Sequence, residues 1–181
     1  IADFNLAYTE HARRNLLAEG LSPRRILVTG SPMGEVLRHY ANQIDASTAL
    51  GNLGLQKGKY FLVSAHRQEN VDGSERLELL LETLKGLHDA WGVPILVSTH
   101  PRTRKRLDAL PGNGRKEGLT FHDPFGFFDY VSLQKNALAV LSDSGTISEE
   151  AAILGFPAVT IRDSMERPEA LDSGSIVMTG L

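Results

Sequence analysis

The sequence contains no cysteine, so disulfide bonds and thiolate chemistry are excluded. It has no long hydrophobic run, because every apolar stretch is far shorter than the roughly 20 residues that a membrane-spanning helix needs. Neither sign of charge is in large excess, and a net charge of −3 offers no basic surface to nucleic acid or an anionic membrane. The basic cluster at 102–106 is more typical of a solvated helix face.

The residues that are present are those of a globular protein. Of 181 residues, 41% are hydrophobic and 23% are charged, which is enough for the core of one domain or slightly more. No signal peptide is recognisable, and the first residue is Ile rather than Met. We therefore expect an excised part of a cytoplasmic protein that binds neither nucleic acid nor a membrane.

Short β-rich runs alternate with helical patterns along almost the whole chain. The predicted strands cover residues 25–29, 60–64, 94–98, 119–122, 138–142, 158–161 and 175–178. The predicted helices cover residues 9–19, 31–43, 46–52, 74–91, 102–110, 128–136, 144–154 and 168–171. This alternation with short connections predicts an α/β fold with a doubly wound, Rossmann-like parallel sheet.

Polar residues gather where the predicted strands end. They are His66 and Arg67 after strand 60–64, His100 after strand 94–98, Arg162 after strand 158–161, and Arg167 in the segment beyond. In a doubly wound sheet, ligands bind outside the carboxyl ends of the strands. Histidines and arginines on one such edge indicate an anion site, most economically one for a phosphorylated ligand.

The end of strand 138–142 adds a second phosphate signal. The strand breaks at Ser144 and Gly145 into an amphipathic helix, which directs backbone N–H groups and the positive end of the helix dipole at a ligand. In the next turn and a half, Glu149 or Glu150 can accept hydrogen bonds from sugar hydroxyls. The plainer alternative is an ordinary strand–helix turn closed by a capping box of Thr146 and Glu149.

Other chemistries find weaker support. The histidines and carboxylates match no zinc motif, so no metal is expected. A hydrolytic triad of Ser144, a histidine and Asp143 is disfavoured, because the Gly-x-Ser-x-Gly elbow is absent and adjacent residues cannot readily orient one histidine. The glycine-rich loops that bind ATP and dinucleotides are also missing.

Taken together, the motifs carry a family resemblance. The segments are SAHRQEN at 64–70, THP at 99–101, SDSG at 142–145 with Glu149 and Glu150, and RDSMERPE at 162–169. Their order and spacing resemble those of the non-hydrolysing UDP-N-acetylglucosamine 2-epimerases, over essentially the whole chain. Residues 8–30 are similar to the segment that joins the two domains of this family.

The resemblance implies the C-terminal half of a two-domain GT-B fold. Residues 1–24 would be the interdomain joining helix and residues 25–181 the UDP-binding domain, with the N-terminal domain absent. The implied activity inverts C2 of a UDP-2-acetamido sugar by eliminating UDP and adding it back, without a cofactor. The resemblance also implies that the whole enzyme is a cytoplasmic homodimer. The carboxylates that act as acid and base would lie in the absent domain.

The resemblance also assigns roles to individual residues. The catalytic His66 would contact the departing diphosphate, Ser144 and Gly145 the phosphates, Glu150 the ribose hydroxyls, and Tyr130 the uracil ring. Arg67 and His100 match positions linked to a second, regulatory UDP-sugar. Arg162 and Arg167 are further candidate anion contacts.

Three alternatives stay open. The form of the SAHRQEN motif, with Phe156-Pro157-Ala158-Val159, is closer to the capsule and O-antigen branch, which includes 2-epimerases of UDP-2-acetamido-2,6-dideoxy-L-talose that lead to UDP-N-acetyl-L-fucosamine. The chain could instead be the donor-binding half of a GT-B glycosyltransferase, which would need an acceptor. A UDP-sensing or structural domain is the third alternative.

Overall fold

A computed structural model describes residues 2–67, 70, 73–114, 116–162 and 174–180. It contains two compact units, Ile1–His39 and Tyr40–Leu181. The division falls later in the chain than the expected boundary after residue 24, which stays a prediction about the domains of a longer protein. Within the described residues, no helix combines the length and apolar character needed to cross a membrane.

The first unit is a small βαβ arrangement followed by a helix. Its elements are β1 (Asn5–Ala7), α1 (Glu10–Ala18), the 3-10 helix η1 (Pro23–Arg25), β2 (Ile26–Val28) and α2 (Met33–His39). β1 and β2 pair in parallel. The Thr9 hydroxyl accepts a 3.1 Å hydrogen bond from the Ala12 N–H and so caps α1. The sequence analysis missed β1, because Asn5, Leu6 and Ala7 include no β-branched or aromatic side chain that would indicate a strand.

The second unit alternates strands and helices. Its elements are α3 (Ala41–Asp45), α4 (Ala49–Asn52), β3 (Phe61–Ser64), α6 (Ser74–Trp91), β4 (Ile95–Ser98), α7 (Pro101–Asp108), η2 (Pro111–Gly114), β5 (Leu119–His122), α8 (Phe127–Asn136), β6 (Ala139–Ser142), α9 (Ile147–Leu154), β7 (Ala158–Thr160) and β8 (Ile176–Met178). The predicted helix 31–43 is two helices, because the backbone leaves the helical conformation at Tyr40. The predicted helix 168–171 lies outside the described residues.

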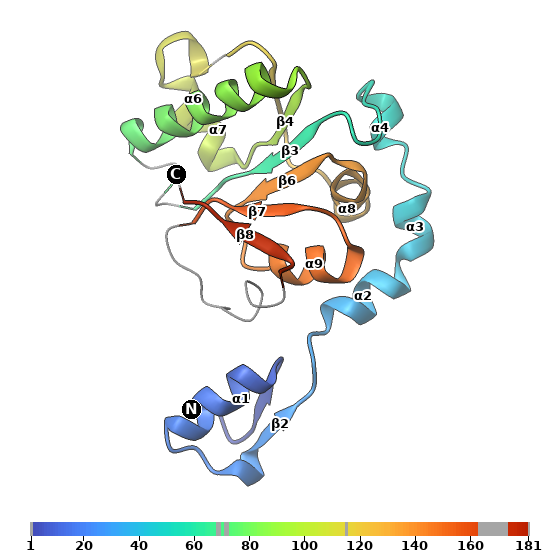
Figure 1. Ribbon diagram of the computed structural model, residues 1–181, viewed down its shortest axis with the longest axis vertical. Helices are drawn as coiled ribbons and strands as arrows, with labels where there is room; N and C mark the ends of the chain where they lie inside the picture. Colours follow the sequence, from blue (N-terminus) through green and yellow to red (C-terminus); the bar gives the residue numbers. More distant parts are fainter. Residues whose placement is uncertain (1, 68–69, 71–72, 115, 163–173, 181) are drawn as a thin grey trace. The chain divides into compact units, whose positions relative to one another are not determined.

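The sheet of the second unit confirms the doubly wound prediction. Its six strands are all parallel and lie in the order β5-β4-β3-β6-β7-β8 (Figure 1). The chain therefore starts in the middle at β3, builds outward to β5, returns to β6, and builds outward to β8. The point at which this direction reverses, between β3 and β6, is where α/β sheets of this kind bind their ligands.

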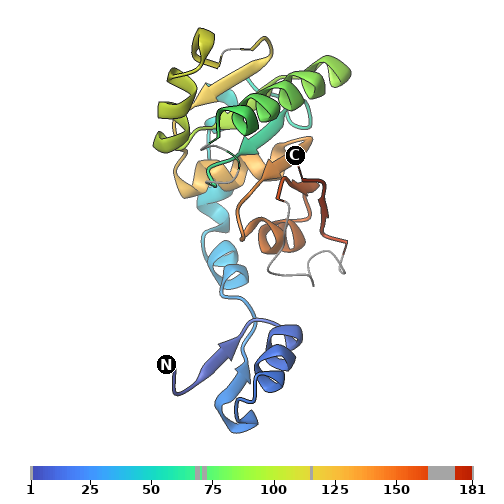
Figure 2. The ribbon, with the colours of Figure 1, turned by 90° about the vertical axis from the view of Figure 1, so that its left-hand side faces the viewer.

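Each face of the sheet is covered by helices. Tyr60 and Leu62 belong to one buried cluster, with Leu133 of α8 and Ile147 of α9. Phe61 and Val63 belong to the other, with the apolar stripe of α6 and with Leu107 of α7. Figures 1 and 2 show these two pairs of helices on opposite sides of the strands. Burial on both faces explains why β3, β4 and β6 read as continuous apolar runs without alternation.

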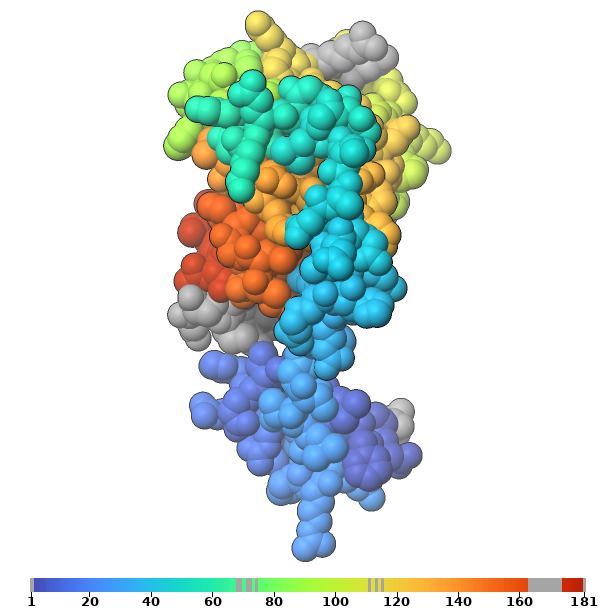
Figure 3. All heavy atoms as spheres, turned by 90° about the vertical axis from the view of Figure 1, so that its right-hand side faces the viewer, coloured from blue at the N-terminus to red at the C-terminus, as the bar shows by residue number. Residues whose placement is uncertain are grey.

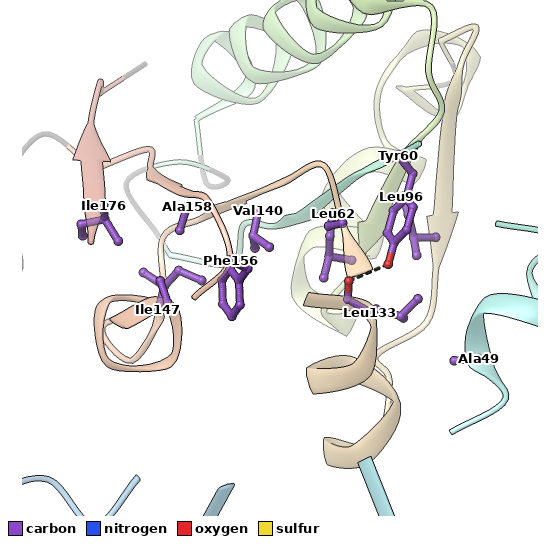
Figure 4. Close-up of a cluster of buried hydrophobic side chains, with 12 residues drawn as sticks. Ala49, Tyr60, Leu62, Leu96, Leu133, Val140, Ile147, Phe156, Ala158 and Ile176 are labelled. Carbon is purple, nitrogen blue, oxygen red and sulfur yellow. Dashed lines mark hydrogen bonds between the residues drawn. The ribbon is translucent and has the colours of Figure 1, made fainter. Parts of the chain in front are cut away.

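The helices α3 and α4 extend the cover over α8, which they contact. Figure 3 shows this segment as a cyan band along one face of the unit. A second link to α8 comes from the sheet itself: the fully buried Tyr60 hydroxyl donates a 2.5 Å hydrogen bond to the Leu133 carbonyl (Figure 4). That carbonyl belongs to the last turn of α8, where helix carbonyls lack intrahelical donors.

We expect Tyr60→Phe to lower the free energy of unfolding by about 1–2 kcal/mol, because it leaves the Leu133 carbonyl without its donor in the core. Urea unfolding measures the change. A matched substitution at the surface, Val177→Ala, should change stability by less than about 0.5 kcal/mol, because this side chain is exposed. Equal losses from the two variants would contradict the role of the Tyr60 hydrogen bond.

Candidate functional site

The predicted site residues lie at the switch point of the sheet. β3 and β6 run in register, with Ser64 opposite Ser142. The two segments that leave these strands therefore start side by side, one carrying His66 and Arg67 and the other carrying residues 143–145. The two segments lie far apart in the sequence, so it is the pairing of β3 with β6 that brings them together.

A buried carboxylate joins these two segments. Asp143 is completely buried, and its Oδ2 accepts hydrogen bonds from the backbone N–H groups of His66 and Arg67, each 2.9 Å long. The Asn70 amide donates to the same oxygen at 3.1 Å. The Arg67 guanidinium, through Nε, donates to the Asp143 carbonyl at 2.8 Å. Asp143 thus holds His66, Arg67 and Asn70 after the end of β3.

The structure brings several of the predicted anion-binding residues close together. The His66 ring is about half exposed, with Nδ1 lying 3.2 Å from Oδ1 of Asp143. The rings of His66 and His100 have centroids 6.0 Å apart. A Cβ atom placed on Gly145 would lie 3.9 Å from Nη2 of Arg67. Residues from the ends of three strands therefore share one edge.

The predicted phosphate turn is held by its own hydroxyl groups. The Ser142 hydroxyl accepts from the Ser144 N–H at 3.1 Å, and the Ser144 hydroxyl accepts from the Thr146 N–H at 3.3 Å. α9 begins at Ile147, so the prediction that it starts at Ser144 is wrong. Such local hydrogen bonds between side chain and backbone compete with helix formation and delay its start.

The capping-box alternative also fails in its expected form. Thr146 occupies the N-cap position of α9, but its side chain makes no capping hydrogen bond within the described part of the chain. Instead its hydroxyl lies 3.1 Å from the Ser144 hydroxyl. The hydroxyls of Ser142 and Ser144, and not a capping box, therefore hold the backbone of the turn before α9.

Glu150 is oriented by the neighbouring helix α8. Nε2 of the fully buried Gln134 donates a 2.6 Å hydrogen bond to Oε2 of Glu150. Tyr130 lies one helical turn before Gln134 and close to the Ser64 side chain at the end of β3. Burial, with a smaller contribution from the charges of Glu150 and Asp143, raises the pKa of Tyr130 and outweighs the opposite effect of Ser64. The phenol of Tyr130 is therefore neutral, and it lies close to Glu150, the residue that we expect to bind the ribose hydroxyls.

Of the two other arginines predicted to contact an anion, the structure describes Arg162 but not Arg167. Arg162 is buried two residues after the end of β7 and follows Ile161, whose carbonyl accepts a 3.5 Å hydrogen bond from the Asn70 amide. Arg167 lies outside the described residues.

Sequence reasoning missed three structural members of this site: Asp143 as an organiser of the loop, Asn70, and Gln134. Each is a polar residue that is completely buried. Asp143 and Asn70 lie inside the SDSG and SAHRQEN motifs, and this position could have marked them as members of the site. Nothing in the sequence marked Gln134, because one polar residue in a helix does not reveal which way it faces.

A doubly wound sheet with a cationic, hydroxyl-rich edge at its switch point defines a nucleotide-binding type of α/β domain. Comparison with known proteins specifies the family. The sequence model of the family described as UDP-N-acetylglucosamine 2-epimerase matches residues 1–181. The chain belongs to the UDP-N-acetylglucosamine 2-epimerase family, and its fold is half of the GT-B architecture of these enzymes.

Individual relatives agree with this assignment. The UDP-N-acetylglucosamine 2-epimerase of Methanocaldococcus jannaschii is 35% identical, over 99% of this chain and 51% of the relative. The structure of the Rickettsia bellii enzyme is 45% identical with a TM-score of 0.91, covering 99% of this chain and 47% of that one. The M. jannaschii structure in complex with UDP-GlcNAc and UDP is 33% identical with a TM-score of 0.88, over 99% and 51%. The chain spans about half the length of these relatives.

Proposed function

We propose that this chain is the UDP-binding half of an enzyme that inverts C2 of a UDP-2-acetamido sugar by eliminating UDP and adding it back. The carrying observation is the convergence of His66, Arg67 and the 142–146 turn at the switch point of a family member. The related M. jannaschii structure that holds UDP-GlcNAc and UDP supports the same ligand class here.

The chemistry of elimination explains why a histidine would stand there. When a base removes the C2 proton, the C1–O bond breaks and its electron pair moves to the diphosphate oxygen. Negative charge therefore grows on UDP, and a hydrogen-bond donor beside it stabilises the transition state more than the ground state. His66 would supply that donor, and the base would come from the other half of the enzyme.

The ligand contacts must also hold UDP while it is detached from the sugar. We assign the phosphates to Ser144 and Gly145, because the turn precedes the amino end of α9. Glu150 would bind the ribose hydroxyls, with Gln134 holding one of its carboxylate oxygens. Tyr130 would pack against the uracil, and Arg162 would contribute positive charge. Arg67 and His100 would serve a second UDP-sugar.

Two measurements test the proposal. Calorimetry on the purified chain should show that it binds UDP, while the chain alone should not epimerise UDP-GlcNAc. An enzyme with both halves should incorporate deuterium at C2 of UDP-GlcNAc in D2O, as followed by proton NMR without any acceptor. A folded chain without affinity for UDP would refute the proposal.

Two further results of the NMR experiment separate the alternatives. Incorporation of deuterium at C2 of UDP-2-acetamido-2,6-dideoxy-L-talose, and not of UDP-GlcNAc, would assign the enzyme to the branch that leads to UDP-N-acetyl-L-fucosamine. Sugar transfer that requires an acceptor, with no exchange at C2, would identify a GT-B glycosyltransferase.

We expect Glu150→Gln to weaken UDP binding and Glu149→Gln to leave it nearly unchanged. The two side chains point about 100° apart on α9, and Glu150 is the one that Gln134 orients. Losing a charged hydrogen-bond acceptor should cost about 1.5–3 kcal/mol, or roughly 10- to 150-fold in Kd. Calorimetric titration of both variants with UDP makes the comparison, and equal effects would remove Glu150 from the ribose site.

A further inference from the structure

The contacts of Asp143 carry one inference about the catalytic histidine. This carboxylate is completely buried, and its Oδ2 accepts a 2.9 Å hydrogen bond from the His66 backbone N–H. Its Oδ1 has no hydrogen-bond partner within the described part of the chain and lies 3.2 Å from ring Nδ1 of His66. The hydrogen bond holds the backbone at His66, and Oδ1 is a buried acceptor that a proton on Nδ1 can satisfy. The ring itself is about half exposed, so its other nitrogen can reach a ligand.

We propose that Asp143 is a positioning residue that keeps Nδ1 of His66 protonated and leaves Nε2 to the ligand. An ionised carboxylate can only accept hydrogen bonds, so an unsatisfied Oδ1 at 3.2 Å favours the tautomer in which Nδ1 carries the proton. From the imidazolium, Nε2 gives its proton to the departing diphosphate, which leaves the neutral ring with its proton on Nδ1, and Nε2 takes that proton back from UDP on re-addition. The carboxylate stabilises the imidazolium whenever both nitrogens are protonated. The kinetic part of this inference rests on the proposed function, and the tautomer does not.

The substitution Asp143→Asn tests the idea without changing the size of the side chain. The amide oxygen can replace Oδ2 as acceptor for the His66, Arg67 and Asn70 donors. Its NH2 group then faces Nδ1 of His66, and two donors cannot share one hydrogen bond. Nδ1 must become the acceptor, so the neutral ring should change to the tautomer with the proton on Nε2.

Nitrogen-15 NMR of the histidine rings reads the tautomer directly on the purified chain. The sequence contains six histidines, and His66→Gln identifies the signal of His66 by its loss. We expect a protonated Nδ1 in the unmodified chain and a protonated Nε2 in Asp143→Asn. A protonated Nε2 in the neutral ring of the unmodified chain overturns the proposal, whether or not the variant folds.

Asn70 provides the matched control. Its amide donates to the carboxylate oxygen Oδ2 at 3.1 Å, and within the described residues no hydrogen bond or ion pair joins it to the His66 ring. Asn70→Ala should therefore leave the His66 tautomer unchanged. If Asn70→Ala changes the tautomer as Asp143→Asn does, general disturbance of the loop explains the effect and the proposal is wrong.

Kinetics of an enzyme that contains both halves give the second readout. Asp143→Asn should lower kcat roughly 100-fold, the size of a general acid–base contribution, with a much smaller change in KM. In a His66→Gln background the same substitution should change kcat by no more than about twofold, because it acts through His66. Independent, multiplying effects would overturn the proposal. Absence of epimerisation by the unmodified enzyme would refute the proposed function and leave the tautomer result to stand separately.

Discussion

Replacing His66 by alanine in an enzyme that contains both halves should lower kcat roughly 100- to 1,000-fold, with a smaller increase in KM. In the proposed reaction the histidine would interact most strongly with charge that appears only as UDP departs, so its loss would be mainly a transition-state loss. The ring is half exposed, and its removal should leave the melting temperature nearly unchanged. Measuring kcat, KM and melting temperature on one preparation separates catalysis from folding.

His122 offers a matched control for this experiment. It ends the edge strand β5, and its ring stacks on Phe125 with centroids 4.1 Å apart. His122→Ala also removes an imidazole from the carboxyl end of a strand, but β5 is the outermost strand and lies away from the switch point between β3 and β6. This variant should keep kcat within about twofold of the unmodified enzyme. An unchanged kcat in folded His66→Ala would remove His66 from the mechanism.

Replacing Leu62 by alanine should lower the free energy of unfolding by about 2–5 kcal/mol. Leu62 has no exposed surface, lies on the central strand β3, and packs in the cluster between the sheet and the helices α8 and α9 (Figure 4). Truncation leaves a cavity that close-packed neighbours fill only in part. Urea unfolding of the chain should show a lower midpoint with an unchanged m-value.

A second leucine-to-alanine change controls for the chemistry of the substitution. Leu79 lies on the outer side of α6 and is 46% exposed. Leu79→Ala should therefore cost less than about 1 kcal/mol. A loss at Leu79 as large as that at Leu62 would contradict the assignment of Leu62 to the core.

The sequence by itself determined most of the secondary structure of the second unit. Helix Ser74–Trp91 and strand Leu119–His122 have the predicted bounds, because a long apolar stripe and a short β-rich run are local signals. The sequence also determined the family, since four motifs in one order identify it more specifically than any single site. The start of α9 was less predictable, because the hydroxyls of Ser142 and Ser144 compete for backbone N–H groups.

Only the tertiary structure decided which polar residues meet. The register of β3 with β6 brings Asp143 to His66, and the packing of α8 against α9 brings Gln134 to Glu150. These pairs depend on strand order and helix packing, which join residues distant in sequence. The sequence could therefore predict His66 and Glu150 as ligand contacts, while the buried groups beside them became visible only in the folded chain.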